Sequence, residues 1–207
     1  MRKITVIALL ACGSVSGMVA VIAYVFGDLR ISRFIQQFDD PYFHWLMVAV
    51  SWPGYLGRQW IVALCVTALL LRFQLKIEAV CLLISAGSNW LLVNAIKLIV
   101  GRPRPSPDLV EVYEHPITMS FPSGHVASYM AIYGFLFYLV YTLMRSSPLR
   151  SALLTLLGAL TGLVGLARVY LGAHWASDVF GGYCLGFFWL GLTIYFYRRR
   201  KGASNPA

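Results

Sequence analysis

The chain has 207 residues, of which 59% are hydrophobic and only 12% are charged. A soluble domain usually carries about a quarter charged residues, so this composition excludes an ordinary soluble enzyme and predicts an integral membrane protein. The apolar stretches are continuous rather than alternating, which favours membrane-spanning helices over the strands of a barrel. We therefore expect an all-α fold, a polytopic bundle of six transmembrane helices with a short interfacial amphipathic segment.

Six apolar stretches approach the ~20 residues that a helix needs to cross a bilayer. In chain order they cover residues 4–26, 56–71, 77–100, 124–143, 152–171 and 179–197. The first contains "LLAC", which resembles a lipoprotein cleavage site, but its apolar run continues to Phe26. Because the apolar region of a signal peptide is only about 7–15 residues long, we expect an uncleaved first span.

The segment between the first two predicted spans differs in pattern. "LRISRFIQQF" has apolar residues at helical spacing with a polar opposite face, which predicts an interfacial amphipathic helix. "YFHWLMVAVSWPGY" is apolar but short, and Pro53 and Gly54 end it. We expect this second stretch to lie at the interface or to enter the membrane without crossing it.

The formal charge of +9 is unevenly distributed along the chain. With the N-terminus in the cytoplasm and six crossings, the cytoplasmic segments hold ten basic residues and one acidic residue, and the other side holds seven of each. The positive-inside rule then predicts an inner-membrane protein with both termini in the cytoplasm. The basic tail is a topology anchor that can contact anionic lipid, and no nucleic-acid partner is expected.

Three cations are predicted to lie near helix ends on the non-cytoplasmic side. Lys97 lies at the end of the third span, Arg104 follows it, and Arg168 lies near the end of the fifth. A single such cation is most simply explained by its side chain reaching the interface, because charge within a membrane is costly. Three cations at the same membrane face favour an anion-binding pocket, since the planar guanidinium group of arginine can bind two oxygens of a phosphate at once.

A second polar group opens the fourth span, in "SFPSGHVASYM" at residues 120–130. Proline is favoured in a first helical turn and serine is a good cap, so Pro122 and Ser123 start the helix. Gly124 lets the backbone come close to a ligand, and the free N–H groups of a helix start bind phosphate. A cap alone leaves His125 unexplained.

The third group contains His174 and Asp178. They are four residues apart, so on a helix they would share one face. A carboxylate in that position can hold one ring nitrogen of the histidine and raise the basicity of the other. The pair is equally compatible with a simple surface interaction when it is taken alone.

Taken together, the patterns K-x6-RP, PSGH and R-x5-H-x3-D resemble those of the phosphatidic acid phosphatase type 2 (PAP2) superfamily of membrane lipid phosphate phosphatases. The resemblance implies one domain over residues 1–207, with its core motifs at residues 97–178. It departs from the family at Ala167, where a serine that contacts phosphate is often found.

The resemblance also implies roles for individual residues. His174 would attack phosphorus and form a phosphohistidine, and Asp178 would orient it. His125 would protonate the leaving oxygen and then activate water. The phosphate-binding residues would be Lys97, Arg104, Ser123, Gly124 and Arg168. No metal or other cofactor is expected, because three cations and a helix start supply the positive charge, and the sequence lacks the carboxylate cluster that Mg²⁺ prefers.

The implied substrate is a membrane lipid phosphate, such as undecaprenyl diphosphate, phosphatidate or phosphatidylglycerophosphate, entering sideways from the bilayer. Two alternatives stay open. One is a phosphotransferase with an acceptor other than water. The other is a protein that binds or transports phospholipid without catalysis, although binding alone needs neither histidine.

The loop acids Asp108, Glu111 and Glu114 either repel an anionic headgroup or pair with Arg102. The oligomeric state is also left open.

Overall fold

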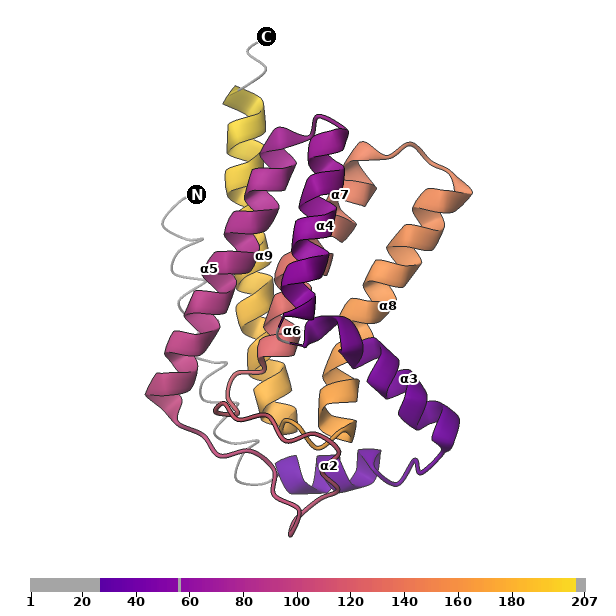
Figure 1. Ribbon diagram of the computed structural model, residues 1–207, viewed down its shortest axis with the longest axis vertical. Helices are drawn as coiled ribbons and strands as arrows, with labels where there is room; N and C mark the ends of the chain where they lie inside the picture. The colour runs from indigo at the N-terminus through magenta and orange to yellow at the C-terminus, as the bar shows by residue number, and fades with distance from the viewer. Residues whose placement is uncertain (1–26, 56, 204–207) are drawn as a thin grey trace.

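The computed structural model describes residues 27–55 and 57–203, and every regular element among them is helical. Four stretches in the described part are long and apolar enough to cross a membrane. They are α5 (Lys76–Val100), the continuous stretch formed by α6 (Gly124–Tyr129), the π-helical turn η2 (Met130–Gly134) and α7 (Phe135–Leu143), then α8 (Pro148–Tyr170) and α9 (Ala176–Ala203) (Figure 1). The predicted all-α membrane bundle is confirmed. The predicted span at residues 4–26 lies outside the described residues.

The predicted second span corresponds to one half of a bent pair of helices. α4 (Arg58–Arg72) has 15 residues, which corresponds to about 22 Å of helix, whereas a bilayer core needs about 30 Å. It is preceded by α3 (Pro41–Ser51) and the short η1 (Trp52–Gly54), and the two halves are bent by 64°. Together they have the length and composition of one broken span or of a re-entrant segment. The described residues therefore hold four spans, or five if this bent pair counts as one.

The amphipathic segment forms α2 (Asp28–Ile35), which lies across one end of the bundle in Figure 1. Its polar residues Asp28 and Ser32 are buried against the protein, while Phe34 on its apolar side is 62% exposed. The exposed face thus carries Phe34 as well as the charged Arg30 and Arg33, whereas a helix on a soluble domain turns its apolar face to the core. This arrangement suits a helix at the membrane interface, whose apolar face meets lipid.

Four helix termini and the loop of residues 101–123 lie at the same end of the bundle. α5 and α8 finish there, and α6 and α9 begin there (Figure 1). The loop is tied to this end by backbone bonds, among them one from the Tyr113 N–H to the Leu171 carbonyl at 3.1 Å. Gly172 has a φ of +66°, and a Cβ atom there would lie 2.1 Å from the Glu111 carbonyl oxygen, so only glycine fits this turn.

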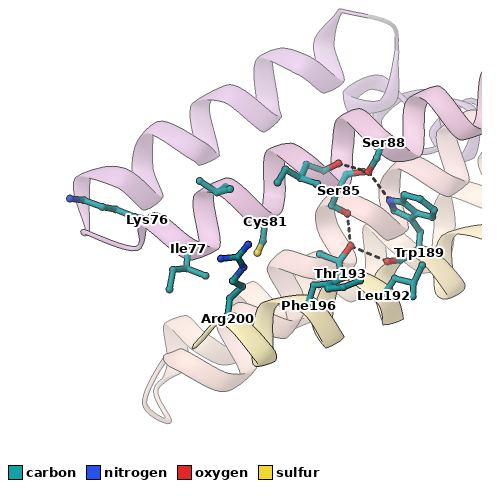
Figure 2. Close-up of a pocket in the computed structure, with 12 residues that line it drawn as sticks. Lys76, Ile77, Cys81, Ser85, Ser88, Trp189, Leu192, Thr193, Phe196 and Arg200 are labelled. Atoms are coloured by element: carbon teal, nitrogen blue, oxygen red, sulfur yellow. Dashed lines mark hydrogen bonds between the residues drawn. The ribbon is translucent and has the colours of Figure 1, made fainter. Parts of the chain in front are cut away.

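A cavity of about 750 Å³ lies between α5 and α9 at the opposite end of these helices (Figure 2). Trp189 and Thr193 of α9 reach across to Ser88 and Ser85 of α5, with hydrogen bonds of 3.1 and 3.0 Å. The cavity is lined by Lys76, Ile77, Val80, Cys81, Ile84, Ser85, Ser88, Trp189, Leu192, Thr193, Phe196 and Arg200. None of the residues predicted to bind phosphate borders it, so it is separate from the candidate site.

Candidate active site

His174 lies on the short turn between α8 and α9, where its backbone N–H donates to the Arg168 carbonyl at 3.2 Å. The prediction that His174 and Asp178 share a helical face is therefore wrong in one respect, because only Asp178 belongs to α9. The turn nevertheless brings their side chains together, with His174 Nδ1 3.6 Å from Asp178 Oδ2. That distance is longer than a hydrogen bond. Both side chains are buried.

The protonation state of His174 follows from its neighbours. Arg104 approaches His174 Nε2 at 3.2 Å through its NH1 group, and a guanidinium can only donate. Nε2 therefore accepts, and the ring proton of the neutral histidine is on Nδ1, facing Asp178. Burial, followed by the positive charges of Arg104, Arg168 and Lys97, lowers the pKa of His174 well below its usual value. At neutral pH the ring is an uncharged imidazole, which is the nucleophilic form.

Lys97 and Arg104 bond mainly to carbonyl oxygens around the site. Lys97 Nζ donates to the carbonyls of Met119 and Ser120, and Arg104 NH1 donates to the Ala173 carbonyl at 2.5 Å. Carbonyl oxygens carry no full charge, so these bonds orient the two cations without neutralising them. Burial and the nearby Arg168 lower the pKa of Arg104 to about 10, which leaves it charged at neutral pH.

Arg168 has a different environment. Its side chain is 1% exposed, and its NH1 group donates to Ser51 Oγ at 2.6 Å and to Glu114 Oε2 at 2.7 Å. The Tyr55 hydroxyl donates to the same Glu114 carboxylate. Of the two roles considered for Glu114, pairing with Arg102 is thus wrong, because its partner is Arg168. Nothing in the spacing of Ser51, Tyr55 or Glu114 along the chain indicated this cluster.

The start of α6 contributes two buried polar atoms that lack a hydrogen-bond partner among the described residues, Ser123 Oγ and His125 Nε2. Ser123 occupies the cap position of the helix, but its side chain makes no capping bond, so its predicted role as a side-chain cap is wrong. Buried polar groups without partners are costly and uncommon. Their presence here leaves one hydroxyl and one imidazole nitrogen available to a ligand.

The three predicted motifs meet in space. The Ser123 N–H donates to the Asp178 carbonyl at 3.0 Å, and Arg104 contacts His174. A Cβ atom on Gly124 would lie 3.9 Å from Lys97 Cε, so the helix start lies beside that ammonium group. The structure therefore gathers cations, a neutral histidine and unsatisfied polar atoms at one end of the bundle, which is an arrangement suited to phosphoryl transfer.

From the sequence, Arg102 was considered only as a partner of the loop acids and Asp28 was not singled out, although both belong to the surroundings of the site. Arg102 NH1 donates to Asp178 Oδ1 at 2.5 Å, and Arg102 NH2 donates to Asp28 Oδ2 at 2.6 Å. Among the residues that the structure describes, no group of three or more His, Cys, Asp or Glu side chains is arranged to hold a metal ion.

The chain is similar to a known family and to individual members of it. Residues 78–202 match the family model of the PAP2 superfamily. Phosphatidylglycerophosphatase B of Bacillus subtilis is 28% identical over 160 residues, which cover 77% of this chain and 77% of that protein. Undecaprenyl-diphosphatase of Sulfolobus acidocaldarius is 33% identical over 136 residues, which cover 63% of this chain and 60% of that protein.

Two crystal structures share the fold. The first transmembrane PAP2 type phosphatidylglycerolphosphate phosphatase from Bacillus subtilis superposes with a TM-score of 0.80 at 23% identity, covering 92% of this chain and 96% of that one. Aquifex aeolicus LpxE superposes with a TM-score of 0.65, also at 23% identity, covering 81% and 94%. At such identities the likeness concerns the arrangement of the helices.

Proposed function

The chain belongs to the PAP2 superfamily, and from this premise we propose that it is a metal-independent phosphatase that hydrolyses a phosphomonoester or diphosphate of a membrane lipid. The observation that carries the proposal is the environment of His174. Its ring is uncharged, its Nε2 atom accepts from Arg104, and its Nδ1 atom faces a buried carboxylate. A buried neutral imidazole among cations that bind anions is suited to attack phosphorus.

In the first half of the proposed reaction, the phosphoryl oxygens bind to Lys97, Arg104, Ser123, Gly124 and Arg168. Arg104 NH1 exchanges its contact with His174 Nε2 for a phosphoryl oxygen, and the freed Nε2 attacks phosphorus. The bond from phosphorus to the leaving oxygen breaks, and His125 gives its proton to that oxygen, which is the ester oxygen of a phosphomonoester or the bridging oxygen of a diphosphate. The cations and the Gly124 N–H stabilise the negative charge of the transferring group. Asp178 stabilises the positive charge that the ring of His174 acquires as it becomes phosphohistidine.

In the second half, His125 accepts a proton from water as the water oxygen attacks phosphorus. The bond between phosphorus and Nε2 breaks, inorganic phosphate leaves, and His174 returns to its neutral form. The unpartnered Nε2 atom of His125 supports both roles, because it has no competing bond among the described residues. No step requires a metal, since Lys97, Arg104 and Arg168 supply the positive charge.

We propose phosphatidylglycerophosphate, undecaprenyl diphosphate and phosphatidate as substrates. The first two are suggested by the names of the B. subtilis and S. acidocaldarius relatives. The exposed apolar side of α2, with Ile31 and Phe34, supports entry of a lipid from the bilayer at the level of its headgroup. We further propose that residues 1–207 form one domain in the inner membrane, with cytoplasmic termini and the site on the opposite face. The distribution of basic residues supports this orientation.

The test is phosphate release by detergent-purified protein in the presence of EDTA, with these three lipids as substrates. We expect release from the wild type and none from His174→Ala. Arg145→Ala is the matched control, because Arg145 is exposed in the turn between α7 and α8, at the other end of the bundle. Equal loss of activity in both variants would show that the site is misplaced. Transfer of phosphate to an added lipid acceptor instead of water would establish a phosphotransferase.

A further inference from the structure

The Asp178 carboxylate uses its two oxygens differently. Oδ2 accepts from the Ser120 hydroxyl at 2.5 Å and from the Trp175 N–H at 2.9 Å, and it is the oxygen that faces His174 Nδ1. Oδ1 accepts from Arg102 NH1 at 2.5 Å. Because a carboxylate is planar, holding Oδ1 fixes the direction in which Oδ2 points. Arg102, together with the two donors on Oδ2, therefore holds the carboxylate in its orientation toward the histidine.

Arg102 is in turn held by the first residue of α2. Its NH2 group donates to Asp28 Oδ2 at 2.6 Å, and its NH1 group also donates to Ser177 Oγ at 2.6 Å. Asp28 accepts the backbone N–H of Ser177 at 2.8 Å and its hydroxyl at 2.5 Å. These bonds join α2, the loop after α5 and the first turn of α9 into one buried arrangement.

The charges in this arrangement are nearly inaccessible to solvent. The side chains of Arg102, Asp28 and Asp178 are 8%, 4% and 0% exposed. Buried charges are tolerated only when they are paired and hydrogen-bonded, and here one guanidinium lies between two carboxylates. The sum is one negative charge beside His174, which is the charge that the proposed phosphohistidine step requires.

We infer that Arg102 is a positioning residue for the reaction. It fixes the Asp178 carboxylate beside His174, and Asp28 fixes Arg102, so the interfacial helix α2 sets the geometry of the nucleophile. The inference rests on the proposed phosphatase function. Arg102 itself is not placed on the phosphate, whose binding is assigned to Lys97, Arg104 and Arg168.

The experiment compares Arg102→Gln, Asp28→Asn and the double variant Asp28→Asn/Arg102→Gln with the full-length wild type in detergent. Arg102→Gln alone leaves two buried carboxylates unpaired and can fail to fold. The double variant removes one positive and one negative charge, so it keeps the wild-type balance with Asp178 as the remaining charge. Arg30→Gln is the control, because Arg30 is an exposed residue of α2. The substrate is the lipid of the three-member panel that the wild type hydrolyses fastest.

If Arg102 positions Asp178, the double variant should have a higher Tm than Arg102→Gln alone. Its kcat should stay about 10- to 100-fold below that of the wild type, which is the usual effect of losing a residue that orients a catalytic group. KM and the inhibition constant of inorganic phosphate should change by less than about threefold, because the phosphate-binding cations are intact. In an Asp178→Asn background, Arg102→Gln should lower kcat by no more than about twofold further, since coupled residues are not additive.

Two results would overturn the inference. One is recovery of kcat in the double variant to the wild-type value, which would mean that Arg102 only balances charge. The other is a full additional loss from Arg102→Gln in the Asp178→Asn background, which would mean that Arg102 does not act through Asp178. Failure of the proposed function looks different, because the wild type and Arg30→Gln would then release no phosphate from any lipid of the panel.

Discussion

Glu114 forms an ion pair with Arg168, with Glu114 Oε2 2.7 Å from Arg168 NH1. Arg168 is one of the three cations assigned to phosphate, and its side chain is 1% exposed. A carboxylate of the loop thus takes up one donor group of this cation. A substrate phosphate that binds to the same group competes with Glu114.

Replacing Glu114 by glutamine should therefore strengthen substrate binding. Glutamine keeps the size of the side chain but removes the negative charge that competes with the phosphate. We expect KM to fall by about threefold to tenfold, which corresponds to roughly 1 kcal/mol, with a smaller change in kcat. Steady-state kinetics with the preferred lipid measure this, and Glu111→Gln, an exposed acid of the same loop, is the matched control. An increase in KM would show that Glu114 instead holds Arg168 in its binding geometry.

Trapping the phosphoenzyme should distinguish the role of His125 from that of His174. His125→Ala should slow turnover by about 10²- to 10⁴-fold, the usual contribution of a general acid and base. The phosphoenzyme should also accumulate, because water is no longer activated. We expect an acid-labile, base-stable phosphoryl label after incubation with ³²P-labelled lipid. The double variant His125→Ala/His174→Ala should carry no label, and a label that persists there would place the nucleophile elsewhere.

The decline of kcat/KM at low pH should reflect the electrostatic environment of His174. Attack needs the unprotonated ring, and burial with the positive charges of Arg104, Arg168 and Lys97 lowers its pKa well below the usual value. The wild type should therefore keep its nucleophile unprotonated on acidification until well below pH 6.5, an ordinary histidine pKa.

Arg104→Gln tests the cause of this shift. With one positive charge removed, the pKa of His174 should rise, and the decline of kcat/KM should move to higher pH together with the lower overall rate. Comparing the two profiles on the same lipid cancels the titration of the substrate phosphate. A decline that does not move would mean that a group other than His174 controls it.

Gly54 should be intolerant of a side chain. A Cβ atom there would lie 2.5 Å from His125 Cδ2 and 2.7 Å from Tyr129 Cε2, so Gly54→Ala must displace the histidine ring. We expect a loss of about 1–3 kcal/mol of stability, typical of overpacking, and a clear reduction in kcat. Gly191→Ala is the control, because nothing lies within 4 Å of a Cβ atom there. Full activity and an unchanged Tm in Gly54→Ala would contradict the close packing of His125 on this turn.

The proposed orientation can be tested with single cysteines in an otherwise cysteine-free protein. We expect Asp108→Cys, in the loop beside the site, to react with a membrane-impermeant maleimide in intact cells. Arg145→Cys should react only after the cells are opened. The prediction follows from the excess of basic residues on the side assigned to the cytoplasm. The opposite labelling pattern would place the site in the cytoplasm.

The sequence by itself determined the membrane class and most of the long helices. The apolar runs at residues 77–100 and 124–143 correspond to α5 and to the stretch from α6 to α7 within a residue. α8 begins four residues earlier than predicted, at Pro148, and α9 extends beyond both predicted ends. Hydropathy works here because crossing a bilayer depends on the length of an apolar run, which is a local property of the chain.

The three motifs were also readable from the sequence, because residue types and spacings within each motif are local. Which residues contact them was decided only by the tertiary structure. Glu114 reaches Arg168 across 54 positions and Arg102 reaches Asp178 across 76. Likewise, Ser123 occupies the expected cap position, but its hydroxyl has no hydrogen-bond partner within residues 27–55 and 57–203. Such contacts depend on which helix ends meet at one end of the bundle, and no periodicity along the chain encodes that meeting.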